Sequence, residues 1–124
     1  MANPNIVNVT VINGNSSQVA LSTTSATSLA SNAASSNKVY KINSIVVANN
    51  NGTTAADITI NIYSAAALGG TAYPIASTIS VPADATLVVT DKTTSFYLLE
   101  NQSIGAIAGT ANYLTVTSSW EEIT

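Results

Sequence analysis

Apolar and polar residues alternate along much of the chain with a period of two, which is the spacing of side chains on opposite faces of a β-strand. The clearest run is DITINIY, in which Ile58, Ile60 and Ile62 share one face. β-Branched and aromatic residues are frequent in these runs, and such residues fit the half-buried surface of a sheet. The pattern therefore predicts an all-β chain.

Turn residues separate the apolar runs, and they predict how the strands are arranged. The turn signals are Asn13-Gly14, Asn50-Asn51-Gly52, Gly69-Gly70, Val81-Pro82-Ala83-Asp84, Asp91-Lys92 and Gly109-Thr110-Ala111-Asn112. Turns every 8–12 residues or so predict an antiparallel β-sandwich, jelly-roll-like, with about 8–10 short strands. We expect residues 1–124 to form a single domain of this type.

Two segments depart from the simple alternation. Residues 22–37 are rich in Ser, Thr, Ala and Asn, and we expect a short strand near Ala26 to Ser31 followed by a loop. The sequence SAAALGG, residues 64–70, is compatible with one helical turn that Gly69 caps.

The chain has few groups that could do chemistry, since it holds three lysines, six acidic residues, and no arginine, histidine or cysteine. The usual zinc, haem and iron–sulfur ligands are missing, as are Ser–His–Asp and Cys–His catalytic units. A net charge of −3, with only Lys38 and Lys41 close together, argues against nucleic-acid binding. We therefore expect no enzyme, and no catalytic, cofactor-binding or metal-binding residues.

The acidic residues fit turns better than active sites. Glu100 stands between two apolar runs, in YLLENQSIGA, and a Glu-Asn-Gln tip is typical of a solvent-facing turn. A catalytic carboxylate needs an acid or base beside it, and none is evident. Asp57, Asp84 and Asp91 follow no calcium-loop spacing, so we interpret each as a turn or strand-end residue.

Possible interface residues lie near both ends of the chain. Val7, Val9 and Val11 share one face of NIVNVTVI, so residues 1–12 could form an edge strand or an arm that contacts a neighbouring subunit. Trp120, in SSWEEIT, is the one tryptophan. Core packing is the favoured interpretation for Trp120, and a subunit contact is the alternative, because tryptophan is a favoured interface residue.

The location of the protein is constrained by its hydropathy pattern. Apolar runs of about four residues are far shorter than the roughly 20 that a membrane-spanning helix needs. The N-terminal MANPNIVNVT has neither the basic nor the apolar part of a signal peptide. A neutral, Ser/Thr/Asn-rich surface is nevertheless typical of an outside environment. Virion proteins fit both observations, since they are made in the host cytoplasm and released by lysis.

An ordered set of patterns between residues 38 and 122 carries a resemblance to a known group. The patterns are KVYKINSIVVANNNGTTAADITINIY, VPADATLVVTDK, YLLENQSIGA and ANYLTVTSSWEEI. Together they resemble small structural proteins of tailed phages, particularly cyanophages and phages of other marine bacteria. The resemblance covers about 85 of the 124 residues. It implies an all-β sandwich in the virion, and it brings no catalytic residues.

The resemblance favours a capsid decoration, or cement, protein that binds the outer shell of a tailed phage. Its partners would be the major capsid protein or other virion proteins, and we expect a homo-oligomer, with a trimer favoured because icosahedral shells offer three-fold sites. The alternative is a neck, tail or fibre-associated protein with a receptor-binding role, in which Tyr73 and the loop 49–54 would make the contact.

Two further hypotheses come from other classes of protein. A small hydrolase or lyase on a jelly-roll scaffold is disfavoured by the missing histidine, arginine and cysteine. A bacterial surface adhesin module is disfavoured by the missing signal peptide.

Overall fold

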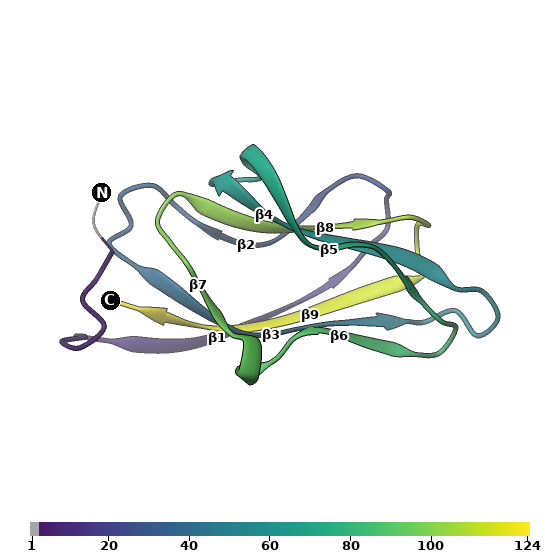
Figure 1. Ribbon diagram of the computed structural model, residues 1–124, viewed down its shortest axis with the longest axis horizontal. Helices are drawn as coiled ribbons and strands as arrows, with labels where there is room; N and C mark the ends of the chain where they lie inside the picture. The colour runs from purple at the N-terminus through teal and green to yellow at the C-terminus, as the bar shows by residue number, and fades with distance from the viewer. Residues whose placement is uncertain (1–2) are drawn as a thin grey trace.

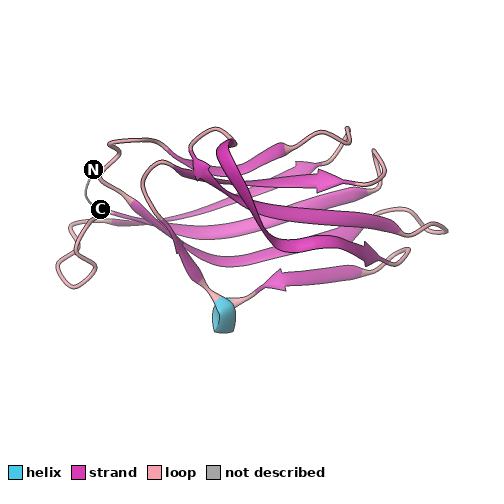
Figure 2. Cartoon of the chain, turned by 45° about the horizontal axis from the view of Figure 1, so that its top comes forward, coloured by secondary structure: helices cyan, strands magenta, loops and turns pink. Residues whose placement is uncertain are grey.

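The protein is a sandwich of two antiparallel sheets, seen in a computed structural model that describes residues 3–124 (Figures 1 and 2). The elements are β1 (Ile12–Ala20), β2 (Thr27–Asn32), β3 (Val39–Asn49), β4 (Ala56–Ala65), β5 (Gly69–Val81), β6 (Thr86–Thr90), the 3₁₀ turn η1 (Lys92–Thr94), β7 (Phe96–Leu98), β8 (Gln102–Ala108) and β9 (Leu114–Ile123). One sheet has the order β1-β9-β3-β6, with the short β7 also paired to β3. The other has the order β2-β8-β4-β5. The predicted all-β antiparallel sandwich is confirmed.

The order of the strands is that of a jelly roll. Strands that are neighbours in the chain hold the same position in opposite sheets: β1 corresponds to β2, β9 to β8, β3 to β4 and β6 to β5. A chain folded into a long double hairpin and wrapped around one core gives this order. The jelly-roll-like prediction is therefore confirmed. The nine described strands fall within the expected number, although β3 and β5, with 11 and 13 residues, are not short.

The core forms where the inner faces of the two sheets meet. Ile58 and Ile60 of β4 are completely buried, as the period-two pattern predicts, and Ile62 packs against the same cluster. Ile45 and Val47 of β3, in the facing sheet, are also completely buried. Other buried members of this core are Leu21, Leu29, Ala30, Tyr40, Ile42, Ala56, Val81, Leu98, Ile104, Ala106, Ala108, Leu114 and Val116.

A buried asparagine at the end of β3 fixes the loop that follows it. Asn49 Nδ2 donates to the carbonyl oxygens of Thr54 at 3.0 Å and Val81 at 2.9 Å, and Asn49 Oδ1 accepts from Asn51 N at 2.9 Å. Asn32 makes three comparable bonds at the end of β2. Because a buried amide must find partners, each asparagine imposes one conformation on its loop.

The N-terminal part of the chain differs from two predictions. The first strand begins at Ile12, so Asn13-Gly14 lies inside β1 and makes no turn. Residues 6–11 form no strand, because Asn5 closes a turn: its Oδ1 accepts from Val7 N at 2.9 Å and its carbonyl from Asn8 N at 3.1 Å. Residues 1 and 2 of the predicted arm lie outside the described residues. The strand predicted near 26–31 is confirmed as β2.

The predicted helical turn at residues 64–70 is wrong. β4 ends at Ala65 and β5 begins at Gly69, with a tight hairpin turn between them. Ala67 and Leu68 have φ values of 56° and 61°, which no right-handed helix contains. The backbone N–H groups of residues 66, 67 and 68 all donate to side-chain oxygens from β2, β8 and the β7–β8 turn, so distant residues hold this turn.

Candidate functional site

One flank of the sandwich is left uncovered along β5. This strand of 13 residues is the edge of its sheet, and the corresponding edge of the other sheet is divided between β6, with five residues, and β7, with three. No described strand pairs with the outer edge of β5. Tyr73, Ile75 and Ile79 of β5 are consequently 59, 40 and 41 % exposed.

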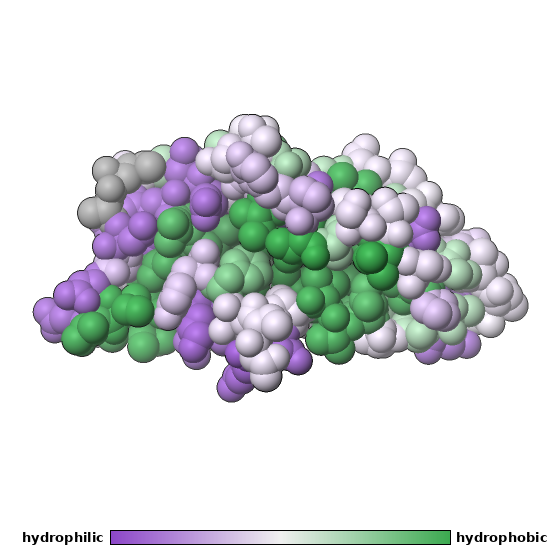
Figure 3. Space-filling view, viewed as in Figure 1, coloured by the Kyte–Doolittle hydropathy of each residue, from purple (hydrophilic) through white to green (hydrophobic). Residues whose placement is uncertain are grey.

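We term the surface between β5 and β6–β7 the open flank. Its residues are Tyr73, Ala76, Ile79, Leu87, Val89 and Phe96. Figure 3 shows apolar atoms gathered between the edges of the two sheets on this side of the molecule. The open flank is thus an apolar surface that continues from the core to the solvent.

Strand register explains why core-type residues reach the surface here. Ile79 lies opposite Ile58, and Leu87 lies opposite Val47. Ile58 and Val47 are completely buried. Because directly opposite residues share a face of the sheet, Ile79 and Leu87 also point to the interior side. Ile79 is exposed because no strand of the described chain covers it there.

The edge of β5 carries no charge, and it is protected against plain strand pairing in other ways. No charged residue occurs between Ile58 and Ala83. Pro74 lacks a backbone donor, and the strand bulges at Thr78, whose φ is 50° and whose N–H donates to Thr59 Oγ1 at 3.0 Å. Proline and bulges disfavour the addition of another strand. The side chains of the open flank remain available for contact.

A second apolar feature is the turn of residues 5–8, which we term the N-terminal tip. Val7 is 91 % exposed and Ile6 is 51 % exposed. Val9 is half-buried and Val11 is exposed, so the three valines do not share one strand face as predicted. In both Figure 1 and Figure 2 the N-terminal segment lies at one end of the sandwich. An interface role for Val7, Val9 and Val11 stays a prediction.

Trp120 packs on the core, which was the favoured interpretation. It lies on β9 and stacks on Tyr40, with ring centroids 6.2 Å apart and an interplanar angle of 22°. Its buried Nε1 has no hydrogen-bond partner among the described residues. Burial, followed by a hydrogen bond to Glu122 and its charge, raises the pKa of Tyr40 to about 12. A subunit contact through Trp120 stays a prediction.

Glu100 occupies the β7–β8 turn, as predicted, but its side chain does not face the solvent. It is only 7 % exposed, and neither carboxylate oxygen has a hydrogen-bond partner within residues 3–124. Asn3 lies beside the turn and accepts a bond from Glu100 N at 3.2 Å. Sequence reasoning missed this burial because the contact joins residues 97 positions apart.

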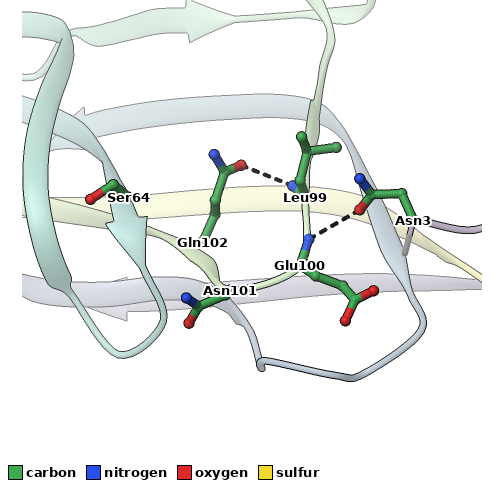
Figure 4. Close-up of a pocket in the computed structure, with 6 residues that line it drawn as sticks. All are labelled: Asn3, Ser64, Leu99, Glu100, Asn101 and Gln102. Carbon is green, nitrogen blue, oxygen red and sulfur yellow. Dashed lines mark hydrogen bonds between the residues drawn. The ribbon is translucent and has the colours of Figure 1, made fainter. Parts of the chain in front are cut away.

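A cavity of about 220 Å³ adjoins this turn (Figure 4). Its lining residues are Asn3, Ser64, Leu99, Glu100, Asn101 and Gln102. Gln102 Oε1 accepts from Leu99 N at 2.9 Å, and Ser64 Oγ accepts from Thr71 N at 2.8 Å. Figure 4 shows Ser64 and the Glu100 carboxylate on opposite sides of the group. The arrangement therefore places no base beside a hydroxyl nucleophile.

The aspartates are separate from one another and have local roles. Asp91 caps η1, and bonds from Thr93 Oγ1 and N hold its pKa below the ordinary value of 3.8. Asp84 lies in the turn after β5, with φ 55°, and Asp57 lies on β4. Among residues 3–124, no three His, Cys, Asp or Glu side chains gather into a group suited to a metal ion.

The residues considered for receptor contact belong to different kinds of element, one to a strand and the others to a loop. Tyr73 is exposed on the edge strand β5 rather than on a loop tip. The loop 49–54 is held by Asn49 and by Asn51, whose Oδ1 accepts from Thr53 N at 2.9 Å and Thr54 N at 2.7 Å. This loop is a rigid surface turn.

Comparison with protein-family models and with curated proteins finds no match to this chain. In the described part of the chain, no helix has the length and apolar character needed to cross a membrane.

Proposed function

We propose that this chain is a non-enzymatic structural protein of a tailed-phage virion, and that it acts as a capsid decoration or cement subunit. The observation that supports the proposal most is the open flank, an apolar surface that continues outward from the core and whose β5 side carries no charge. Extended exposed apolar surface on a small domain is typical of a protein–protein contact. The resemblance to small phage structural proteins supplies the virion as the place of that contact.

The rest of the surface suits repeated packing of many copies. The chain has only nine charged residues, and Ser, Thr and Asn supply most of its polarity. Copies placed side by side on a shell therefore meet little like-charge repulsion. We propose a homo-oligomer, with a trimer favoured, that binds the major capsid protein or other virion proteins. A jelly roll occurs in proteins of many functions, so the fold by itself does not choose among them.

Immunogold electron microscopy of phage particles, with antibody raised against this chain, tests the proposal. Gold spread over the facets of the head is the expected result, and particles stripped of the protein should then lose their shell at a lower temperature. Absence of labelling on every particle would overturn the virion assignment.

The second candidate is a protein of the neck, tail or fibre with a receptor-binding role. The strong exposure of Tyr73 favours it, since tyrosine is frequent at binding contacts. Gold confined to a vertex or to the tail would support this candidate. Binding on a glycan array that Tyr73→Ala abolishes would identify the receptor contact, while Val88→Ala, on another exposed surface, serves as the control.

A further inference from the structure

We propose that β1 pairs with β1 of a second copy of this chain, antiparallel and about a two-fold axis at Ser16. The contact joins the β1-β9-β3-β6 sheets of two copies into one continuous sheet. The inference goes beyond the proposed function, because it concerns an unpaired strand edge and does not depend on where the protein is located.

The outer edge of β1 is a row of backbone groups without partners. Val11 N and Thr124 N each donate to the carbonyl oxygen of the other residue, at 3.3 and 2.9 Å, and Leu21 N donates to Leu114 O at 2.9 Å. Because such residues alternate along an antiparallel strand, the odd-numbered residues of β1 bond to β9 and the even-numbered residues point their groups outward. The outward residues are Ile12, Gly14, Ser16, Gln18 and Ala20. Within residues 3–124, nothing pairs with this edge.

β1 lacks the devices that protect the other edge strands from pairing. Its nine residues pair with β9 without a register shift, and they include no proline and no charge. By contrast, β5 has Pro74 and the bulge at Thr78, β2 has a register shift within six residues, and β6 and β7 are short. A long, regular and uncharged edge is a template for the addition of another strand.

A second copy fits this edge because the outward residues match one another when the strand is reversed. With Ser16 on the axis, Ile12 stands opposite Ala20 of the second copy, so the apolar ends of the row meet. Gly14 likewise stands opposite Gln18. All five outward residues then form hydrogen-bonded pairs, each of which exchanges two bonds. An antiparallel register shifted by two residues would leave either Ile12 or Ala20 without a pair.

Gly14 leaves room for the glutamine that this register places opposite it. A Cβ atom at Gly14 would meet no other atom within 4 Å. On the other side of Gly14 lies Glu121, its partner on β9. Strand spacings of about 4.8 Å put the Cα atoms of Glu121 and the second copy's Gln18 about 10 Å apart, which two extended side chains can span. The Glu121 carboxylate then accepts from the Gln18 amide, and a shifted register would lose this bond.

The contact is isologous, because the same strand serves both copies. Two copies use up the edge completely, so the pairing closes at two and does not extend into a fibre. It is therefore different from the three-fold contact proposed above. A trimer held by another surface would carry three such edges, and β1 would then join one trimer to the next.

Disulfide trapping in the full chain tests the pairing and its register, because the native chain has no cysteine. Differently tagged Gly14→Cys and Gln18→Cys chains are mixed under mild oxidation, and each chain oxidised alone is the matched control. Opposite residues of a hydrogen-bonded pair have Cα atoms about 5.5 Å apart, which suits a disulfide. Two copies of residue 14 would instead be offset by about 13 Å along the strand, which is too far.

Pairing predicts that the mixed disulfide forms at least about tenfold faster than either disulfide between identical chains, because pairing raises the effective concentration of the opposite residues. Ser16→Cys alone should react at the fast rate, since residue 16 lies on the axis. Equal rates for all combinations would overturn the inference, and so would a fast reaction of Gly14→Cys with itself. Rates no higher than that of Val88→Cys, at an exposed site on the opposite edge of the sheet, would also overturn it.

Proline at Ser16 gives an independent measurement. The Ser16 N–H points away from β9, so Ser16→Pro removes an outward donor and should leave the urea midpoint close to the native value. Built into both cysteine chains, it should slow the mixed disulfide at least about tenfold, whereas Ser16→Ala should not. Ser16→Lys, which sets like charges opposite each other at the axis, should slow it as well. Unchanged rates with both proline and lysine would overturn the inference, while absence of virion labelling would overturn only the proposed location.

Discussion

Replacement of Glu100 by methionine should stabilise the protein. Both carboxylate oxygens are buried and without a hydrogen-bond partner within residues 3–124, so folding removes them from water without compensation. An unsatisfied buried polar group costs about 1–3 kcal/mol. Methionine has a similar length and no strong acceptor, so Glu100→Met should raise the free energy of unfolding by about 1–3 kcal/mol. Glu100→Gln should raise the free energy of unfolding less, because its amide would also be buried without hydrogen-bond partners.

Urea denaturation, followed by tryptophan fluorescence, measures the change. With an m-value of about 2 kcal/mol/M, the midpoint should rise by about 0.5–1.5 M for Glu100→Met. Glu121→Met makes the same chemical change at a half-exposed site on β9, and it should alter stability by less than about 0.5 kcal/mol. A lower midpoint for Glu100→Met than for the native chain would show that the carboxylate has a favourable partner, and the reasoning would fail.

Three further predictions concern single side chains. Asn49→Ala removes three hydrogen bonds and should lower the free energy of unfolding by about 2–5 kcal/mol in urea melts. Asn50→Ala, at an exposed neighbour with one side-chain bond, should lower it by under about 1 kcal/mol, and equal losses would contradict the role of Asn49 in fixing its loop. Because the pKa of Tyr40 is about 12 in the folded protein, the protonated phenol stabilises the fold fully below pH 10, and this contribution, at most about 3 kcal/mol, is lost as pH rises from 10 to 12. Tyr40→Phe should lose less stability over that interval, and parallel pH profiles would argue against a buried phenol. The lowered pKa of Asp91 gives the opposite dependence. The ionised carboxylate stabilises the fold above pH 3.8, and this stabilisation is lost as pH falls through the pKa of Asp91 in the folded protein. The difference in stability between the native chain and Asp91→Asn should therefore shrink in acid melts, and a constant difference would contradict the capping bonds.

Local patterns were sufficient to predict the class of fold and several of its elements. The alternation in DITINIY predicted β4 with its buried face, and the turns at residues 50–52 and 82–84 lie where they were expected. These features depend on residues that are close in sequence, which is why period and turn chemistry could identify them. β2 was found on the same grounds, in spite of its Ser- and Asn-rich composition.

The features that the patterns missed depend on distant contacts or on competing local bonds. Pro74 and three register shifts between β4 and β5 concealed most of β5 before its final residues 78–81, because the bulges interrupt its alternation. The hairpin at Ala67 and Leu68 is held by side chains from other strands. At the N-terminus, the Asn5 side chain accepts a hydrogen bond from the backbone N–H of Val7, and this turn replaces the strand that the valines suggested. The open flank arises from a mismatch in length between β5 and the divided edge of β6 and β7, which no single segment reveals.

The position of β9 has a consequence for how the chain folds during synthesis. β9 is the last of the described strands, yet it lies between β1 and β3 and pairs with both. Neither of these two pairings can form until residues 114–123 are present. Among the described strands, β4–β5 is the one pairing between strands that are consecutive in the chain. Such remote pairings make folding slow, because long loops must close before their contacts stabilise anything. A chain that stops before Leu114 should therefore remain protease-sensitive, and the chain that includes β9 should become resistant in one step.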